Sequence, residues 1–168
     1  DSRHVAFCTG RGERQFVVYD GIVREFKGKL VSIGAEFSPD SQRFAHILVR
    51  EKDRMCVVVD GVAGPDYEHV ATGADGRNLH FSPDSQHLAY VAERNQKWCV
   101  VRDGVEDKQY YEIAVVRFSP DSRHLAYQAN TGVRRKLVID GIEADMKSTD
   151  RITAGLAFAP LGLLLYVA

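Results

Sequence analysis

The chain has 168 residues, of which 45% are hydrophobic and 27% are charged, and its formal net charge is −1. This is the composition of a globular domain with a core of its own. A net charge near zero excludes a general attraction to nucleic acid or to an anionic membrane. The longest apolar run, at the C-terminus, is too short to cross a bilayer, so we expect no membrane insertion.

A ten-residue motif recurs along the chain. It starts as a partial copy, DSRHVAF from Asp1, and ends as a divergent copy, FAPLGLLLYVA from Phe158. Three full copies stand between them: FSPDSQRFAH from Phe37, FSPDSQHLAY from Phe81 and FSPDSRHLAY from Phe118. A period near 40 residues indicates an array of one supersecondary unit. We expect a single domain, 1–168, with units at 1–34, 35–77, 78–114 and 115–154 and a partial unit at 155–168.

A second marker follows each motif copy. It is a hydrophobic run that ends in Asp-Gly, and its aspartates are Asp20, Asp60, Asp103 and Asp140. The distance from the motif Phe to this Asp stays at about 22 residues, which indicates paired strands in a fixed register. The distance from the Asp to the next motif Phe varies between about 15 and 21 residues, which indicates a surface loop.

Each unit predicts four short strands. The first ends at the motif Phe, as in 79–81 and 116–118, and Ser-Pro-Asp-Ser then forms a turn. The second strand, as in 87–92, is expected to alternate apolar and polar residues, and a polar segment separates it from the Val-rich third strand. Asp-Gly favours a tight hairpin. A weaker fourth strand is expected near 67–70 and 110–114.

Four-stranded units of this length suit the blades of a β-propeller. The motif FSPDS(Q/R)HLAY, followed by the Val-rich run and Asp-Gly, closely resembles the TolB-like (WD-repeat-like) β-propeller repeat over essentially the whole chain. The resemblance implies an all-β fold of four-stranded antiparallel blades, about four of them in this chain. Since the family has periplasmic members, it also suggests a bacterial envelope location, with the cytoplasm as the alternative.

The sequence leaves three arrangements open for completing the ring of blades. The chain is part of a larger propeller, or it closes as a small ring, or two copies pair their open blade edges as a homo-oligomer. Four blades is the lower limit for a propeller, which favours the first and the third arrangements.

The Ser, Asp and His of the motif are interpreted as turn and strand residues. The serines lack a G-x-S-x-G context, the aspartates lack a calcium-loop pattern, and the histidines occur one per unit, so they do not converge on a metal. The three cysteines, Cys8, Cys56 and Cys99, lack metal-site spacing and suit small core positions. We therefore expect no catalytic residue, metal or cofactor, and no enzyme activity.

Two sets of residues are candidates for binding. One precedes the motif Phe on the expected innermost strand and comprises Glu36, His80 and Arg117. The other is basic, lies at or beside the loops between the second and third strands, and comprises Arg11, Arg14, Arg50, Lys52, Arg54, Arg94, Arg134, Arg135 and Lys136. Because acidic residues gather after the Asp-Gly turns, we expect a basic face opposite an acidic one; ordinary solvated loops are the alternative.

The sequence thus predicts a non-catalytic scaffold that binds a protein or peptide, acidic in character, through its basic loop face. One alternative is the gating propeller of a larger hydrolase, as in propellers that resemble this repeat and accompany α/β-hydrolase peptidases. Another is a small-molecule or glycan site near Glu36, His80 and Arg117.

Overall fold

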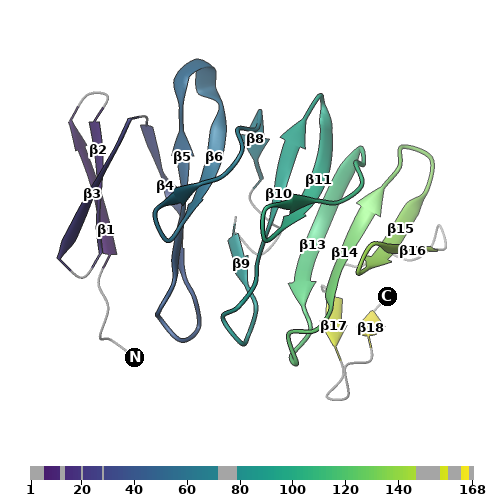
Figure 1. The fold of residues 1–168 in the computed structure, drawn as a ribbon. Helices are drawn as coiled ribbons and strands as arrows, with labels where there is room; N and C mark the ends of the chain where they lie inside the picture. Colours follow the sequence, from purple (N-terminus) through teal and green to yellow (C-terminus); the bar gives the residue numbers. More distant parts are fainter. Residues whose placement is uncertain are drawn as a thin grey trace.

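The computed structural model describes residues 6–11, 14–19, 21–27, 29–71, 79–146, 156–158 and 164–166. This part of the chain is all-β, with a single short 3-10 turn, η1 (Glu51–Asp53). Figure 1 shows its sheets standing side by side in chain order, which is the arrangement of propeller blades. None of the described residues belongs to a helix capable of crossing a membrane.

The strands form antiparallel meanders, which we call blades 1 to 4 and the C-terminal pair. Blade 1 contains β1 (Ala6–Arg11), β2 (Arg14–Tyr19) and β3 (Ile22–Lys27). Blade 2 contains β4 (Lys29–Phe37), β5 (Phe44–Val49), β6 (Met55–Val59) and β7 (Val62–Ala63). Blade 3 contains β8 (His69–Val70), β9 (Leu79–Phe81), β10 (Leu88–Arg94), β11 (Lys97–Arg102) and β12 (Val105–Glu106). Blade 4 contains β13 (Glu112–Phe118), β14 (Leu125–Asn130), β15 (Arg135–Ile139) and β16 (Ile142–Asp145), and the pair is β17 (Leu156–Phe158) with β18 (Leu164–Tyr166).

The motif Phe closes the first strand of its blade, as the sequence predicts. Phe37, Phe81 and Phe118 are the last residues of β4, β9 and β13. In blade 3 this strand is made of two pieces, since β8 and β9 both pair with β10. The divergent C-terminal copy also forms this strand pair, since Phe158 pairs with Leu164. Its turn is one residue shorter than in the full copies, where Phe81, for example, pairs with Leu88.

The fourth strands begin directly after the Asp-Gly turns, so the prediction of this strand near 67–70 and 110–114 is wrong for most of those residues. The strands are β7, β12 and β16, which pair with β6, β11 and β15. Tyr67 and Tyr110 still reach the third strands through single bridges to Met55 and Trp98. The chain then crosses to the next blade, where His69–Val70 pairs with β10. Pro65 lacks an N–H, which helps to leave the edge strand short in blade 2.

The core lies between blades. One cluster of buried side chains joins blades 2 and 3, and another joins blades 3 and 4. The second strands are therefore buried on both faces, and all but the last residue of Phe44–Val49 are fully buried. The expected alternation of buried and exposed residues is wrong for this strand, because neighbouring blades cover both of its faces.

The Asp-Gly pairs form the predicted hairpin turns. Asp60 and Gly61 have φ of 52° and 83°, and Asp103 and Gly104 have φ of 52° and 81°. Two successive left-handed residues define a type I′ turn, whose twist matches that of the strands it joins.

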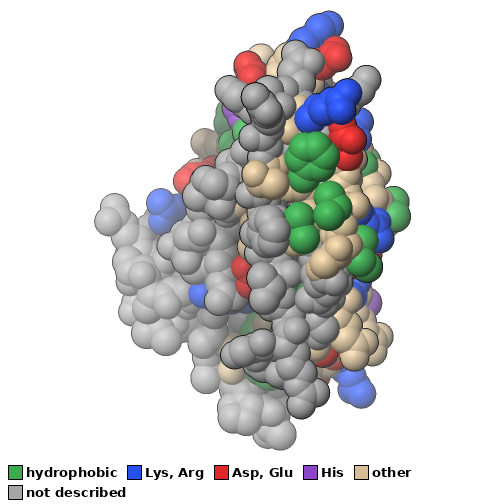
Figure 2. All heavy atoms as spheres, turned by 90° about the vertical axis from the view of Figure 1, so that its left-hand side faces the viewer, with side chains coloured by type: hydrophobic (Ala, Val, Ile, Leu, Met, Phe, Trp, Pro, Cys, Tyr) green, Lys and Arg blue, Asp and Glu red, His purple; other side chains and the backbone are tan. Residues whose placement is uncertain are grey.

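The described strands make an open array. Blade 1 and the C-terminal pair lie at its opposite ends in Figure 1. Figure 2 looks onto the blade 1 end and shows hydrophobic side chains exposed beside charged ones on its described surface. A β-branched residue follows every Asp-Gly and is exposed in each blade: Ile22, Val62, Val105 and Ile142.

Candidate functional site

The first motif serine is buried and holds its own turn. Ser82 Oγ donates to Asp84 Oδ1 and accepts the backbone N–H of His87 at 2.9 Å. The backbone of Ser85 donates to the carbonyl of Ser82 at 2.9 Å, which closes the predicted Ser-Pro-Asp-Ser turn. The serines in the equivalent positions, Ser38 and Ser119, make the same side-chain contacts. These hydroxyls are therefore structural donors and acceptors within the turn.

The serine hydroxyl also fixes the charge of the motif aspartate. Its hydrogen bond holds the pKa of Asp84 below the ordinary value, and a backbone N–H from Gln86 lowers it further. The pKa values of Asp40 and Asp121 are lowered by the same contacts. The three carboxylates are accordingly ionised acceptors at neutral pH.

The motif histidine pairs with the aspartate of the Asp-Gly turn. His87 Nδ1 lies 2.7 Å from Asp103 Oδ2, and His124 Nδ1 lies 2.6 Å from Asp140 Oδ2. In blade 2 the same position is occupied by Arg43, whose Nε donates to Asp60 at 3.0 Å. Since a guanidinium does not act as a base, the shared role of this position is to tie the two turns of a blade together.

The second motif serine joins one blade to the preceding one. The backbone N–H of Asp40 donates to Ser85 Oγ at 3.0 Å, and that of Asp84 donates to Ser122 Oγ at 2.9 Å. Arg43 adds a contact to the next blade, donating to the carbonyl of Gln86 at 2.7 Å. The motif is therefore a joint within and between blades.

The basic loop residues lie beside acids, so the expected separation into a basic and an acidic face is wrong. The ion pairs are Arg14–Glu25, Arg50–Asp66, Arg54–Glu68, Arg94–Glu106, Arg134–Asp145, Lys136–Glu143 and Lys136–Asp145. The acids follow the Asp-Gly turns, but the fourth strand runs antiparallel to the third and carries them back toward the basic loops. Lys52 and Arg135 make no ion pair with another described residue, and the side chain of Arg11 lies outside the described part.

The candidate set on the first strands occupies one repeated position of the blades. Glu36, His80 and Arg117 stand opposite the alanine that follows the first residue of the second strand in blades 2, 3 and 4. Their strands, β4, β9 and β13, contact one another in order. None of the three lines either of the two grooves described below.

The cysteines occupy core positions. Cys56 and Cys99 are free and fully buried on the third strands, whereas the side chain of Cys8 lies outside the described residues. Burial raises the pKa of Cys99 to about 11, so its thiol is protonated and unreactive at neutral pH. Within the described residues, no group of His, Cys, Asp or Glu side chains is arranged to hold a metal ion.

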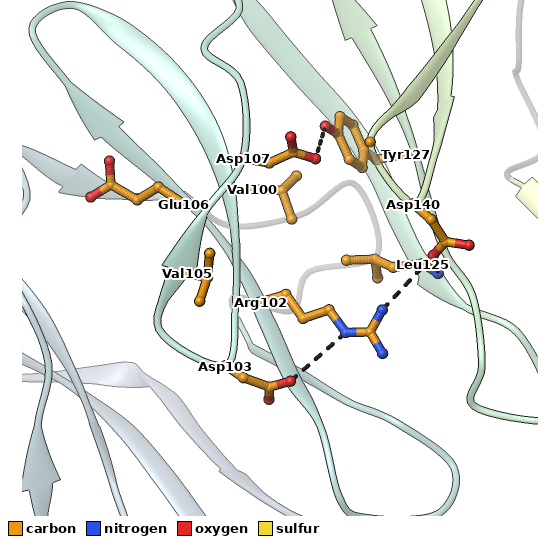
Figure 3. A pocket seen from close by; sticks show the side chains of 10 residues that line it. Val100, Arg102, Asp103, Val105, Glu106, Asp107, Leu125, Tyr127 and Asp140 are labelled. Carbon is orange, nitrogen blue, oxygen red and sulfur yellow. Dashed lines mark hydrogen bonds and ion pairs between the residues drawn. The ribbon is translucent and has the colours of Figure 1, made fainter.

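Two grooves between blades were not predicted from the sequence. Groove 3–4 has a volume of about 450 Å³ and lies between the outer strands of blade 3 and the second strand and Asp-Gly turn of blade 4 (Figure 3). Its lining comprises Val100, Arg102, Asp103, Val105, Glu106, Asp107, Leu125, Tyr127, Asp140 and Gly141. Groove 1–2, of about 220 Å³, is its repeat equivalent and is lined by Val17, Ile22, Arg24, Gln42, Phe44, His46, Asp60 and Gly61.

Groove 3–4 is lined by acidic side chains above apolar ones. Tyr127 donates to Asp107 at 2.7 Å, and Arg102 lies 3.8 Å from both Asp103 and Asp140 (Figure 3). Burial raises the pKa of Tyr127, so its hydroxyl stays a donor. The fourth residue after the Asp of Asp-Gly differs in charge between these blades, being Arg24 in blade 1 and Asp107 in blade 3.

Solved structures match this chain at the level of the fold. The β-propeller domain of the Trilobed protease from Pyrococcus furiosus matches with a TM-score of 0.51 and 12% identity, over 86% of this chain and 53% of that one. TolB from Acinetobacter baumannii matches with a TM-score of 0.46 and 16% identity, over 96% of this chain and 44% of that one. The predicted β-propeller fold is confirmed by the strand arrangement together with the match to the protease propeller domain.

The chain spans about half the length of the solved structures it matches. No protein-family model matches it. No curated protein matches it.

Proposed function

We propose that this chain is a non-catalytic β-propeller module that binds a protein or peptide partner. One observation carries the proposal: the chemistry-bearing side chains of the motif have the same structural partners in successive blades. Even where arginine replaces histidine, at Arg43, the contact to the Asp-Gly aspartate is kept. Residues that serve the repeat in this way leave the variable loops and grooves as the surfaces for function.

We place the binding surface at the end of the blades where loops join the second strand to the third. The loop in blade 2 carries a 3-10 turn over Glu51–Asp53, whereas blade 3 turns tightly through Asn95 and Gln96. Since most bases at this end already pair with acids, the partner is recognised through Lys52 and Arg135 and through polar groups of the loops. Lys52 and Arg135, which make no ion pair within the described strands and loops, favour an acidic segment of the partner.

A capture experiment with two variants tests this surface. The immobilised chain is used to isolate a binding protein, and the double variant Lys52→Glu, Arg135→Glu is compared with Gln86→Glu at the other end of the blades. Reversing Lys52 and Arg135 breaks no ion pair among the described residues, so the fold is preserved. Loss of the captured protein in the double variant alone supports the proposal, and equal capture by all forms contradicts it.

A second candidate function is the propeller part of a larger hydrolase. The match to a protease propeller domain, at a TM-score of 0.51, favours it. Reading the parent gene on both sides of this segment tests it. A neighbouring α/β-hydrolase segment with a G-x-S-x-G nucleophile supports this function, and the absence of any hydrolase segment removes it.

We also propose that further blades complete the open array into a ring, supplied by a longer parent chain or by a second copy. Open blade edges carry unpaired backbone groups, which favour such completion. Light scattering on the isolated chain separates the two sources. Twice its mass of 18.8 kDa indicates a second copy, and a single mass excludes a second copy as the source of the blades.

A further inference from the structure

The two grooves lie at the same site of the repeat, and the position that differs in charge is the fourth residue after the Asp of Asp-Gly. The fourth residue after the Asp of Asp-Gly is Arg24 in blade 1 and Asp107 in blade 3. Both residues lie next to the same valine position of the third strand and face the following blade. Arg24 pairs with Val17 in the sheet, and the backbone N–H of Asp107 donates to the carbonyl oxygen of Val100. Blade 1 therefore shows what this site of the fold can hold.

In groove 1–2 the occupant is a guanidinium. Arg24 Nη1 donates to the carbonyl oxygen of Asp60, across the blade boundary, at 3.0 Å. The guanidinium lies over Gly61, where an added Cβ would meet Nη1 at 1.4 Å. A carbonyl oxygen and a glycine without a side chain thus form a cradle for this cation.

In groove 3–4 the same cradle faces a carboxylate in place of the arginine. Gly141 is also left-handed, with φ of 79° against 83° at Gly61, and an added Cβ there would lie 3.7 and 3.8 Å from the two carboxylate oxygens of Asp107. The groove is the larger of the two, at about 450 Å³ against about 220 Å³. The site therefore has the carbonyl and the glycine, and a negative charge stands where blade 1 has its arginine, although Arg102 lines the groove beside Asp103 and Asp140.

Asp107 carries the unmatched charge of this groove. Its oxygens accept from two neutral donors, the Tyr127 hydroxyl and the backbone N–H of Lys108, each at 2.7 Å, and it makes no ion pair within the described residues. Each of the other acids has an arginine beside it: Glu106 pairs with Arg94 at 3.0 Å, and Arg102 lies 3.8 Å from both Asp103 and Asp140. A carboxylate offers about four acceptor positions, so Asp107 can accept two more hydrogen bonds.

The walls suit an aliphatic stem. Val105 is 71% exposed and stands on the blade 3 side, and Leu125 stands on the blade 4 side (Figure 3). An arginine side chain buries its methylene groups on apolar surface of this kind while its head reaches polar groups. A guanidinium also matches a carboxylate with two parallel hydrogen bonds, which an ammonium does not.

We propose that groove 3–4 binds an arginine side chain of a peptide partner. The guanidinium lies between the Asp107 carboxylate and the Asp140 carbonyl oxygen, where the cradle of groove 1–2 holds Arg24, and its stem lies along Val105 and Leu125. The peptide nature of the ligand rests on the proposed function, but the site is at the opposite end of the blades from Lys52 and Arg135.

Titration of the ¹⁵N-labelled chain with N-acetyl-arginine N-methylamide, followed by NMR, tests the site. The control ligand is the citrulline analogue, which has the same shape and no charge. We expect the arginine ligand to shift the amide signals of Asp107 and Gly141, and the citrulline ligand to leave them unchanged. Equal shifts with both ligands, or shifts confined to other residues, would overturn the proposal.

Three variants sharpen the result. Asp107→Asn keeps the shape and the Tyr127 contact, and should weaken binding about 10-fold. Asp107→Arg supplies the cation that blade 1 already has, and should abolish binding. Asp53→Asn, on an exposed loop at the other end of the blades, is the control and should bind the arginine ligand as the unmodified chain does. Unchanged affinity of Asp107→Asn for the arginine ligand would refute the site. The capture experiment tests the surface around Lys52 and Arg135, and the NMR titration tests groove 3–4. Either proposal can therefore fail while the other one stands.

Discussion

Asp84 and Ser122 connect neighbouring blades through one hydrogen bond, from the backbone N–H of Asp84 to the hydroxyl of Ser122 at 2.9 Å. The same bond joins Asp40 to Ser85 at 3.0 Å. Both serines are buried, and both adopt a left-handed backbone that turns the hydroxyl toward the preceding blade. The second motif serine therefore sets how one blade sits against the next.

Replacing Ser122 with alanine removes this joint. We expect the free energy of unfolding to fall by about 1–2 kcal/mol, because the N–H of Asp84 loses its partner at a part-buried position. Equilibrium urea denaturation measures the loss. Gln86→Ala, at an exposed position next to Ser85, is the matched control and should change stability by less than about 0.5 kcal/mol. Equal values for the two variants would contradict the joint.

His46 makes the fold sensitive to acid. Burial lowers its pKa to about 4 from the ordinary 6.5, and its exposed fraction is 2%. The unfolded chain therefore binds more protons than the folded one between these two values, and stability falls as the pH falls through this window. The loss should reach about 3 kcal/mol once the pH is below the folded pKa.

His46→Tyr separates this effect from that of the carboxylates. Tyrosine occupies the equivalent position in the other blades, at Tyr90 and Tyr127, so the variant should fold. Urea denaturation at several pH values should show a smaller loss of stability between pH 6.5 and about 4 for the variant than for the unmodified chain. Parallel slopes in the two proteins would refute the role of His46.

Gly61 and Gly104 provide a paired test of the arginine cradle. Both have left-handed φ, so alanine at either position should cost about 1 kcal/mol of backbone strain. Gly61→Ala must also displace the Arg24 guanidinium, whereas nothing lies within 4 Å of a Cβ on Gly104. The extra cost at Gly61 should be about 0.5–1 kcal/mol, the net value of one hydrogen bond.

A double-mutant cycle isolates that extra cost. In an Arg24→Ala background, Gly61→Ala should destabilise the chain by the same amount as Gly104→Ala. If the difference between the two glycines survives the removal of Arg24, the guanidinium is not its cause.

The turns of the blade could be predicted because their residues act locally. Pro and Asp in Ser-Pro-Asp-Ser, and Asp-Gly between two apolar runs, fix the backbone through their own sterics and hydrogen bonds. The constant distance between these turns predicted strands in a fixed register, and Glu36, His80 and Arg117 share one position opposite the second strand.

What depended on contacts between strands and between blades could not be predicted in the same way. The acids after Asp-Gly return along the third strand to the basic loops, so Asp66 pairs with Arg50 and Asp145 with Arg134. The outer strand gave a weak signal because its residues at a sheet edge are half exposed and, in blade 2, include Pro65. The grooves arise only when two blades meet, and the segments after Asp-Gly, which contain Arg24 and Asp107, vary too much between repeats to mark them.

The stability of two equivalent serine variants tests most directly whether the motif residues are structural. Ser82 and Ser119 are fully buried, and each hydroxyl donates to its motif aspartate and accepts the N–H of its motif histidine at 2.9 Å. We predict that Ser82→Ala and Ser119→Ala each lower the free energy of unfolding by about 2 kcal/mol, and by nearly equal amounts, since the two turns are copies. Unchanged stability in either variant would contradict the structural role of the motif and reopen the search for chemistry within it.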